Sequence, residues 1–207
     1  MSNEQPIVYV VDDDPSVLRS IERLLRLHDL RSRAYQSPWK FLDDLEVEAP
    51  GCVLLDLSLP GASGLEVQQQ LAAAGAAQPI VFLTGHGTVQ SSVRAMKAGA
   101  IDFIEKPFES AALLASVRRA LERDAMLREK RSRDLAISGR LAALTPRESE
   151  VLRHVIAGRL NKQIAARLGT AEKTVKVHRA RVMHKMSVRS VAELTRIALV
   201  VGIQPEP

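Results

Sequence analysis

The first half of the chain alternates short apolar runs with segments of helical periodicity. Apolar runs predict strands at residues 7–11, 33–35, 52–55, 80–83 and 101–104, the second of them weak and brief. Apolar spacing predicts helices over 16–28, 37–45, 65–74 and 88–98, and another from Ser110 onward. Continuous apolar strands alternating with helices are typical of a parallel sheet covered on both faces. The pattern therefore predicts an α/β domain with a (βα)5 doubly wound parallel sheet.

Two of these helices have clear start signals. Pro15 suits the first turn of the first helix, with Asp14 as its cap. The Ser37-Pro38 pair starts the second helix in the same way. We expect the buried faces of these two helices to carry Val17, Ile21, Leu24 and Leu25 in the first, and Trp39, Phe41, Leu42 and Leu45 in the second. The stretch 59–64 is expected to be a loop.

From Leu141 onward the pattern is purely helical. Thr145-Pro146-Arg147-Glu148 combines a cap, a proline and an acid, which predicts a helix start, and Gly158 ends that helix. A short helix over 161–168, a turn at Gly169-Thr170 and a basic helix over 172–186 follow. Two helices joined by a glycine turn, the second of them basic, are typical of a helix-turn-helix. We expect an all-α, four-helix helix-turn-helix domain here.

A charged helix is predicted between these two parts, over residues 118–138, with Ser138-Gly139 at its end. We accordingly predict a domain over 1–122, a helical linker over 123–140 and a second domain over 141–207. The net charge of +5 is unevenly distributed: −6 over residues 1–117, +3 over 118–138 and +8 over 139–207. A basic module of this kind often binds nucleic acid, and a solvated basic surface is the alternative.

Composition narrows the class of protein further. The single cysteine, Cys52, excludes an intrachain disulfide and suits a reducing compartment. The amino terminus lacks the basic and apolar regions of a signal peptide, and no run reaches the ~18 apolar residues of a membrane span. We therefore expect a cytoplasmic protein without a membrane partner.

Polar residues that can bind a metal ion or a phosphoryl group follow four of the predicted strands. Asp12 and Asp13 follow the first strand, Asp56 the third, Thr84 the fourth and Lys106 the fifth. The carboxyl ends of parallel strands share one edge of a sheet, so these side chains should meet there. Three carboxylates suit Mg²⁺, and one of them, best Asp56, can act as a nucleophile toward a phosphoryl group. The alternative for three adjacent acids is a solvated turn or a helix cap, which Asp14 fits.

Four motifs carry a family resemblance over residues 5–122: "VVDDD", "LLDLSLPG", "FLTGHG" and "GAIDFIEKPF". They resemble the receiver domain of two-component response regulators. The resemblance implies a phosphoryl group transferred from a sensor histidine kinase to Asp56. It also implies Mg²⁺ held by Asp12, Asp13, Asp56 and the backbone carbonyl of Ser58, with the phosphoryl oxygens bound by Thr84 and Lys106. Phe103 takes the place of the family's rotating aromatic residue, and the Lys106-Pro107 bond is expected to be cis.

Two positions depart from the family pattern. Ser58 stands where the nearest relatives carry arginine, and Thr88 stands where aspartate is common. Ser58 and His86 would flank the acyl phosphate. A small side chain at Ser58 leaves room for attacking water, so the resemblance does not fix the lifetime of the phosphoryl group on Asp56. A simple loop position is the alternative for His86.

The basic module resembles the LuxR-type helix-turn-helix of the NarL/FixJ family through "LTPRE", "NKQIA" and "TVKVHRARVMHKM". In that family the second helix enters the major groove. The resemblance implies that base edges meet Lys176, Val177 and Ala180, and that phosphates meet Lys173, Thr174, His178, Arg181 and Lys185. Phosphate contacts set affinity and base contacts set sequence preference.

Together these features predict a FixJ-like response regulator rather than an enzyme. Phosphorylation would favour a homodimer that forms through the face of residues 88–98, 101–104 and 110–122. This homodimer would bind double-stranded promoter DNA. The resemblance implies transcriptional activation with RNA polymerase as a partner. The alternatives are a Mg²⁺-dependent phosphatase of the haloacid-dehalogenase type, a protein-adaptor helix-turn-helix, and a regulator independent of phosphorylation. Phosphatases of that type carry a second acidic residue two positions after the nucleophile, where this chain has Ser58.

Overall fold

The computed structural model describes residues 5–85, 96–97 and 99–206. The chain divides into two compact units, Met1–Arg128 and Glu129–Pro207. The predicted helix over 88–98, with His86 and Thr88, lies almost wholly outside the described residues, and only Met96 and Lys97 of it are seen, in helical conformation.

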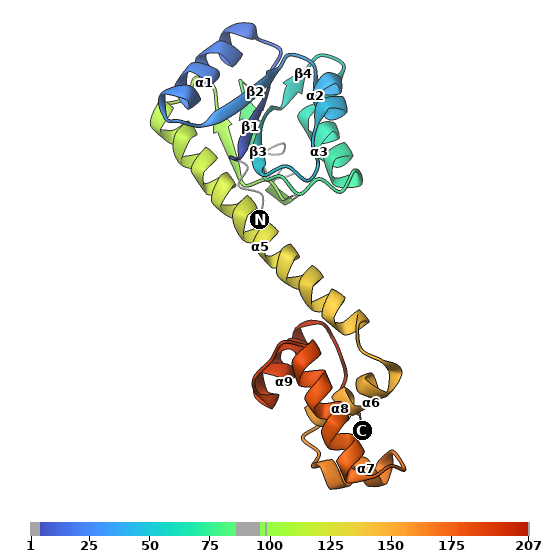
Figure 1. Cartoon of the computed structure of the whole chain (residues 1–207). Coiled ribbons are helices and arrows are strands. Elements are labelled where there is room, and N and C mark those ends of the chain that lie inside the picture. The colour runs from blue at the N-terminus through green and yellow to red at the C-terminus, as the bar shows by residue number, and fades with distance from the viewer. Residues whose placement is uncertain (1–4, 86–95, 98, 207) are drawn as a thin grey trace. The chain divides into compact units, whose positions relative to one another are not determined.

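A five-stranded parallel sheet forms the centre of the first unit (Figure 1). Its strand order is β2-β1-β3-β6-β7, and every neighbouring pair is parallel. The strands are β1 (Ile7–Val11), β2 (Arg31–Tyr35), β3 (Gly51–Asp56), β6 (Ile80–Thr84) and β7 (Asp102–Glu105). The predicted strands are thus confirmed, and β1, β3 and β6 are buried along their whole length, as expected of strands covered on both faces.

Helices cover both faces of the sheet, which confirms the doubly wound arrangement. α1 (Pro15–Leu27) and the first part of α5 (Ser110–Ala142) pack with Val8, Val10 and Leu54 on one face. α2 (Pro38–Asp44) and α3 (Gly64–Ala73) pack with Tyr9 and Val53 on the other. Alternate residues of each strand point to opposite faces, so one apolar run supplies both cores.

Two details differ from the prediction. The expected loop 59–64 contains a small antiparallel pair, β4 (Ser58–Leu59) and β5 (Ala62–Ser63), closed by a turn at Gly61 with φ +78°. Trp39 was expected on the buried face of α2, but 46% of its surface is exposed. Trp39 and Phe41 lie two positions apart, about 200° around a helix, and Phe41 takes the buried position.

The long helix α5 does not end at Ser138-Gly139 as predicted. It continues through both residues to Ala142. A glycine inside a helix costs only about 1 kcal/mol, and contacts of the following residues can outweigh that. Leu141 and Leu144 pack against the core of the second unit, and these contacts support the extra turn.

Four further helices complete the second unit and confirm the helix-turn-helix arrangement. They are α6 (Pro146–Ile156), α7 (Asn161–Arg167), α8 (Glu172–Lys185) and α9 (Val191–Val200). Thr145 caps α6 in a reciprocal capping box with Glu148, as its sequence predicts. Gly169, with φ +60°, makes the turn between α7 and α8. Among the helices of the described residues, none has the length and apolarity needed to cross a membrane.

Candidate functional sites

Three carboxylates meet at the carboxyl-terminal edge of the sheet. Asp12 follows β1 directly and Asp56 is the last residue of β3. One oxygen from each of Asp12, Asp13 and Asp56 lies within 4.8 Å of the others. Asp12 is fully buried and Asp56 nearly so, while Asp13 is exposed. Register fixes this meeting, because β1 and β3 are direct neighbours in the sheet.

Lys106 neutralises part of this charge. Its Nζ donates to Asp12 Oδ2 and, over 2.8 Å, to Asp56 Oδ2. The backbone N–H of Lys106 donates to the carbonyl of Thr84 at 2.6 Å, so β6 and β7 hold the lysine at this edge. The Lys106-Pro107 bond is cis, as expected. Buried charges persist only when they are paired, and this lysine provides the pairing.

Burial and pairing act in opposite directions on the protonation of this pocket. Burial raises the pKa of Asp12 and outweighs the hydrogen bonds from Lys106 and from the Asp14 backbone. Burial alone would lower the pKa of Lys106, but its hydrogen bonds to Asp12 and Asp56, with their charges, raise it instead. The lysine therefore stays charged between two carboxylates.

The backbone around Asp56 is held closely. The N–H of Ser58 donates to Asp56 Oδ1 at 3.1 Å. A Cβ on Gly64 would stand 2.4 Å from the Asp56 carbonyl oxygen, so only glycine lets α3 begin against this strand. Asp14 is separate from the pocket: its Oδ1 caps α1 by accepting the Ser16 N–H at 2.7 Å. The cap interpretation thus holds for Asp14 and not for Asp12.

Two further predicted positions lie near the pocket. Thr84 is the buried last residue of β6. Phe103 lies on β7 in register with Phe82 and packs, partly buried, against the core on the α2–α3 face. Thr84 therefore lies at the carboxyl end of β6, and Phe103 lies on the neighbouring edge strand β7, two positions before the residue opposite Thr84.

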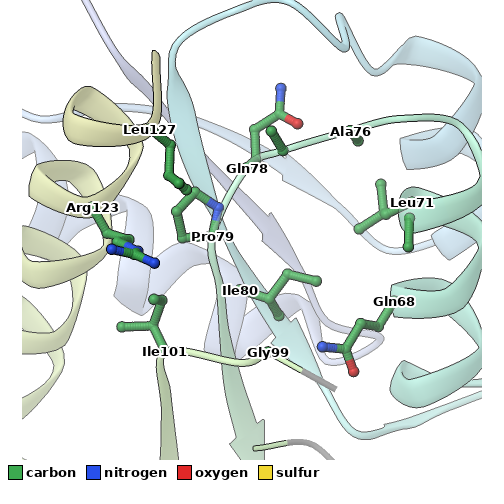
Figure 2. Close-up of a pocket in the computed structure, with 12 residues that line it drawn as sticks. Gln68, Leu71, Ala76, Gln78, Pro79, Ile80, Gly99, Ile101, Arg123 and Leu127 are labelled. Atoms are coloured by element: carbon green, nitrogen blue, oxygen red, sulfur yellow. The ribbon is translucent and has the colours of Figure 1, made fainter. Parts of the chain in front are cut away.

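A cavity of about 220 Å³ lies at the opposite edge of the same sheet. Figure 2 shows Leu71 of α3 and Arg123 and Leu127 of α5 around Pro79 and Ile80, where β6 begins. Strands β1, β3 and β6 deliver their acids and Thr84 at their carboxyl ends, so this cavity is not part of the acidic pocket.

In the second unit, α8 presents a basic and exposed face. The predicted contact residues that are exposed on it are Lys173, Thr174, Lys176, Val177, Ala180 and Arg181. His178 is half-buried. His184 is also exposed and lines a shallow hollow with Val177, Ala180, Arg181 and Lys185. His184 was not among the predicted contact residues, although its spacing of four from Ala180 and three from Arg181 indicates the same face.

Two basic residues of α8 bind other parts of the unit. Arg179 donates to Asn161 Oδ1 of α7 at 3.0 Å. Lys185 Nζ lies 2.7 Å from Glu148 Oε2 of α6 and donates to the Ala143 carbonyl at 2.9 Å. Positive charge on a recognition helix therefore does not always point outward.

Comparison with known protein families accounts for both units. Residues 8–118 match the response regulator receiver domain, and residues 142–198 match the bacterial regulatory proteins of the luxR family. Nodulation protein W of Bradyrhizobium diazoefficiens is 43% identical, over 98% of this chain and 89% of its own. Transcriptional regulatory protein FixJ of Azorhizobium caulinodans is 42% identical, over 96% of this chain and 94% of its own.

Solved structures of response regulators resemble this chain over nearly its whole length. The response regulator StyR has a TM-score of 0.89 with 44% identity, over 95% of this chain and 100% of its own. Full-length FixJ from B. japonicum has a TM-score of 0.60 with 36% identity, over 97% and 99%. The family consists of transcription factors rather than enzymes, so the phosphatase alternative is not supported.

The acidic pocket on a receiver fold and the basic α8 of a helix-turn-helix thus agree with the family match over nearly the whole chain. The chain belongs to the two-component response regulators of the FixJ type, transcription factors with a phosphoacceptor aspartate site and a LuxR-type DNA-binding domain.

Proposed function

We propose that Asp56 is the phosphoacceptor and that a sensor histidine kinase is the donor. The observation that carries this assignment is the ammonium of Lys106, which bridges Asp12 and Asp56. A carboxylate oxygen of Asp56 attacks the phosphorus of the donor phosphohistidine. The P–N bond breaks, its electron pair stays on the imidazole nitrogen, and an acyl phosphate forms on Asp56. Lys106 then offers its charge to the phosphoryl oxygens.

The donor set fits Mg²⁺. Carboxylate and carbonyl oxygens are its preferred protein ligands, and three carboxylates with a single lysine leave negative charge to balance. Asp12, Asp13, Asp56 and the Ser58 carbonyl would hold the ion. When bound, it supplies positive charge that stabilises the transferred phosphoryl group.

We further propose that Thr84 and Lys106 bind the phosphoryl oxygens and that Phe103 moves with Thr84. This change would favour a homodimer through strand β7 and the first turns of α5, together with residues 88–98, most of which lie outside the described residues. We divide the chain into domains at 1–122, 123–140 and 141–207. The family matches over 8–118 and 142–198 support this division.

In the DNA-bound dimer, Lys176, Val177 and Ala180 would face base edges. Lys173, Thr174, His178 and Arg181 would contact phosphates, and the exposure of most of them on α8 supports this. Lys185 was expected to contact phosphate too. We propose promoter binding, transcriptional activation with RNA polymerase and a cytoplasmic location, in line with the regulatory relatives.

The test uses the full chain with Mg²⁺ and acetyl phosphate, read by intact mass. Wild type should gain the mass of one phosphoryl group, and Asp56→Asn should gain none. Asp14→Asn is the matched control, because it changes an adjacent acid that only caps α1, and it should be labelled like wild type. Equal labelling of Asp56→Asn would refute the assignment.

Dimerisation is tested separately by light scattering with beryllofluoride and Mg²⁺. Wild type should shift from monomer to dimer, and Asp56→Asn should not. A wild type that stays monomeric would refute phosphorylation-driven dimerisation while leaving the labelling result intact.

A further inference from the structure

Lys185, the last residue of the recognition helix α8, points toward other helices of its own unit. Its Nζ lies 2.7 Å from Glu148 Oε2, and the Glu148 side chain is only 3% exposed. It also donates to the carbonyl of Ala143, one residue past the end of α5, at 2.9 Å. The Lys185 side chain is 33% exposed, and its ammonium is held by two groups of its own unit.

A second bond joins the same two helix ends in the opposite direction. Arg140 Nη1, in the last turn of α5, donates to the carbonyl of Met186 at 3.2 Å. Met186 caps α8, and carbonyls at helix ends have no partner within the helix. Each helix end thus supplies a donor to the other.

Glu148 extends this link to the start of α6. Its Oε2 also accepts the backbone N–H of Thr145 at 2.9 Å, as part of the capping box. The hydrogen bonds from Lys185 and Thr145 lower the pKa of Glu148 to about 2, so its carboxylate stays charged. The end of α8 is thereby attached to the beginning of α6.

We propose that Lys185 is a positioning residue for DNA binding. Through Glu148 and Ala143 it holds α8 in the orientation in which its other basic side chains reach DNA. Arg140 lies in the last turn of α5, just before the matched luxR-family region begins at residue 142. This last turn is therefore a functional part of the DNA-binding unit. This inference rests on the proposed function of α8.

Neutralising Glu148 separates this role from a direct phosphate contact. Glu148→Gln keeps the capping box, which accepts glutamine, but removes the charged partner of Lys185. If Lys185 only contacted phosphate, the variant would bind DNA more tightly, because a nearby negative charge is gone. If Lys185 positions α8, the variant should bind about tenfold more weakly, because the other basic side chains of α8 then make poorer phosphate contacts.

Glu150→Gln is the matched control. It makes the same charge change on the same helix, but Glu150 pairs with Arg147 and not with Lys185. We would measure binding of the full chain, activated with beryllofluoride and Mg²⁺, to a mixed-sequence duplex of about 30 base pairs, roughly three helical turns. Salt is varied, and the temperature is kept well below each unfolding midpoint. Glu150→Gln should bind as wild type does or slightly more tightly.

Lys185→Met and the double variant Glu148→Gln/Lys185→Met complete the set. The losses of the two single variants should not add in the double variant, because both substitutions break the same link. Three results would overturn the positioning role: unchanged or tighter binding by Glu148→Gln, additive losses in the double variant, or a lower unfolding midpoint at full affinity. Failure of wild type and Glu150→Gln to bind at any salt would instead refute the proposed function itself.

Discussion

At the scale of the residue, Lys106 sets the charge balance of the acidic pocket. Asp12 and Asp56 are buried acids, and the ammonium of Lys106 lies between them. The exposed Asp13 adds a third negative charge. One lysine among three carboxylates leaves a net negative site, which attracts a divalent cation and repels a further carboxylate.

Replacing this lysine should destabilise the receiver and make it depend on cations. Lys106→Met leaves two close carboxylates without a buried counter-charge, so the free energy of unfolding should fall by about 3 kcal/mol without divalent ions. Added Mg²⁺ should restore part of the loss. Urea denaturation with and without Mg²⁺ measures both effects. Lys40→Met, an exposed position on α2, is the control and should change little. Equal stability of the two variants would contradict this account.

At the scale of the element, α5 is fastened to the opposite edge of the sheet. Asp124 is 2% exposed, and its Oδ2 accepts the Gly51 N–H at 2.9 Å and Arg128 Nε at 2.7 Å. Arg128 donates in turn to the carbonyls of Glu48 and Ala49. These hydrogen bonds give partners to the backbone groups of the segment that leads into β3, the strand that ends at Asp56.

Removing this attachment should loosen the start of β3. Asp124→Ala should lower the free energy of unfolding by about 2 kcal/mol, because it leaves the Gly51 N–H and Arg128 without a charged acceptor. The Gly51 amide should also exchange its hydrogen faster. The control is Asp134→Ala, the same substitution further along α5. Slow exchange at Gly51 in Asp124→Ala would show that another group holds this edge.

At the scale of the whole molecule, the described residues form separate cores. The two faces of the sheet supply two clusters in the first unit, and α6 to α9 supply the third. Among the residues that the structure describes, none belongs to a cluster of both units. Since apolar burial is the main source of stability, each unit carries its own.

Unfolding by heat should therefore show two transitions. Val182→Ala leaves a cavity in the second core and should lower the free energy of unfolding of that unit by about 2 kcal/mol. Only one of the two transition midpoints should therefore fall. Val53→Ala, in the first unit, should lower the other. Differential scanning calorimetry of the full chain distinguishes them. A single transition moved by both variants would mean that the two units unfold as one.

Sequence alone predicted the sheet and the acidic pocket well, for a physical reason. Continuous apolar runs and the parallel register dictate that Asp12 and Asp56 meet at one edge. What escaped prediction depends on tertiary contacts. The end of α5 at Ala142 depends on packing by Leu141, and the inward direction of Lys185 depends on Glu148, 37 positions away. A helical pattern gives the face of a residue but not the partner that draws it inward.

The exposed Trp39 has a consequence for optical spectroscopy. It is the chain's one tryptophan, and its Nε1 lies 3.9 Å from where a Cβ on Gly61 would stand, in the turn that follows Asp56. Both tyrosines and all four phenylalanines also lie before residue 129. Near-ultraviolet absorbance and intrinsic emission therefore originate entirely in the receiver. The DNA-binding unit is dark at these wavelengths, so the chain carries a label-free optical probe of one unit alone.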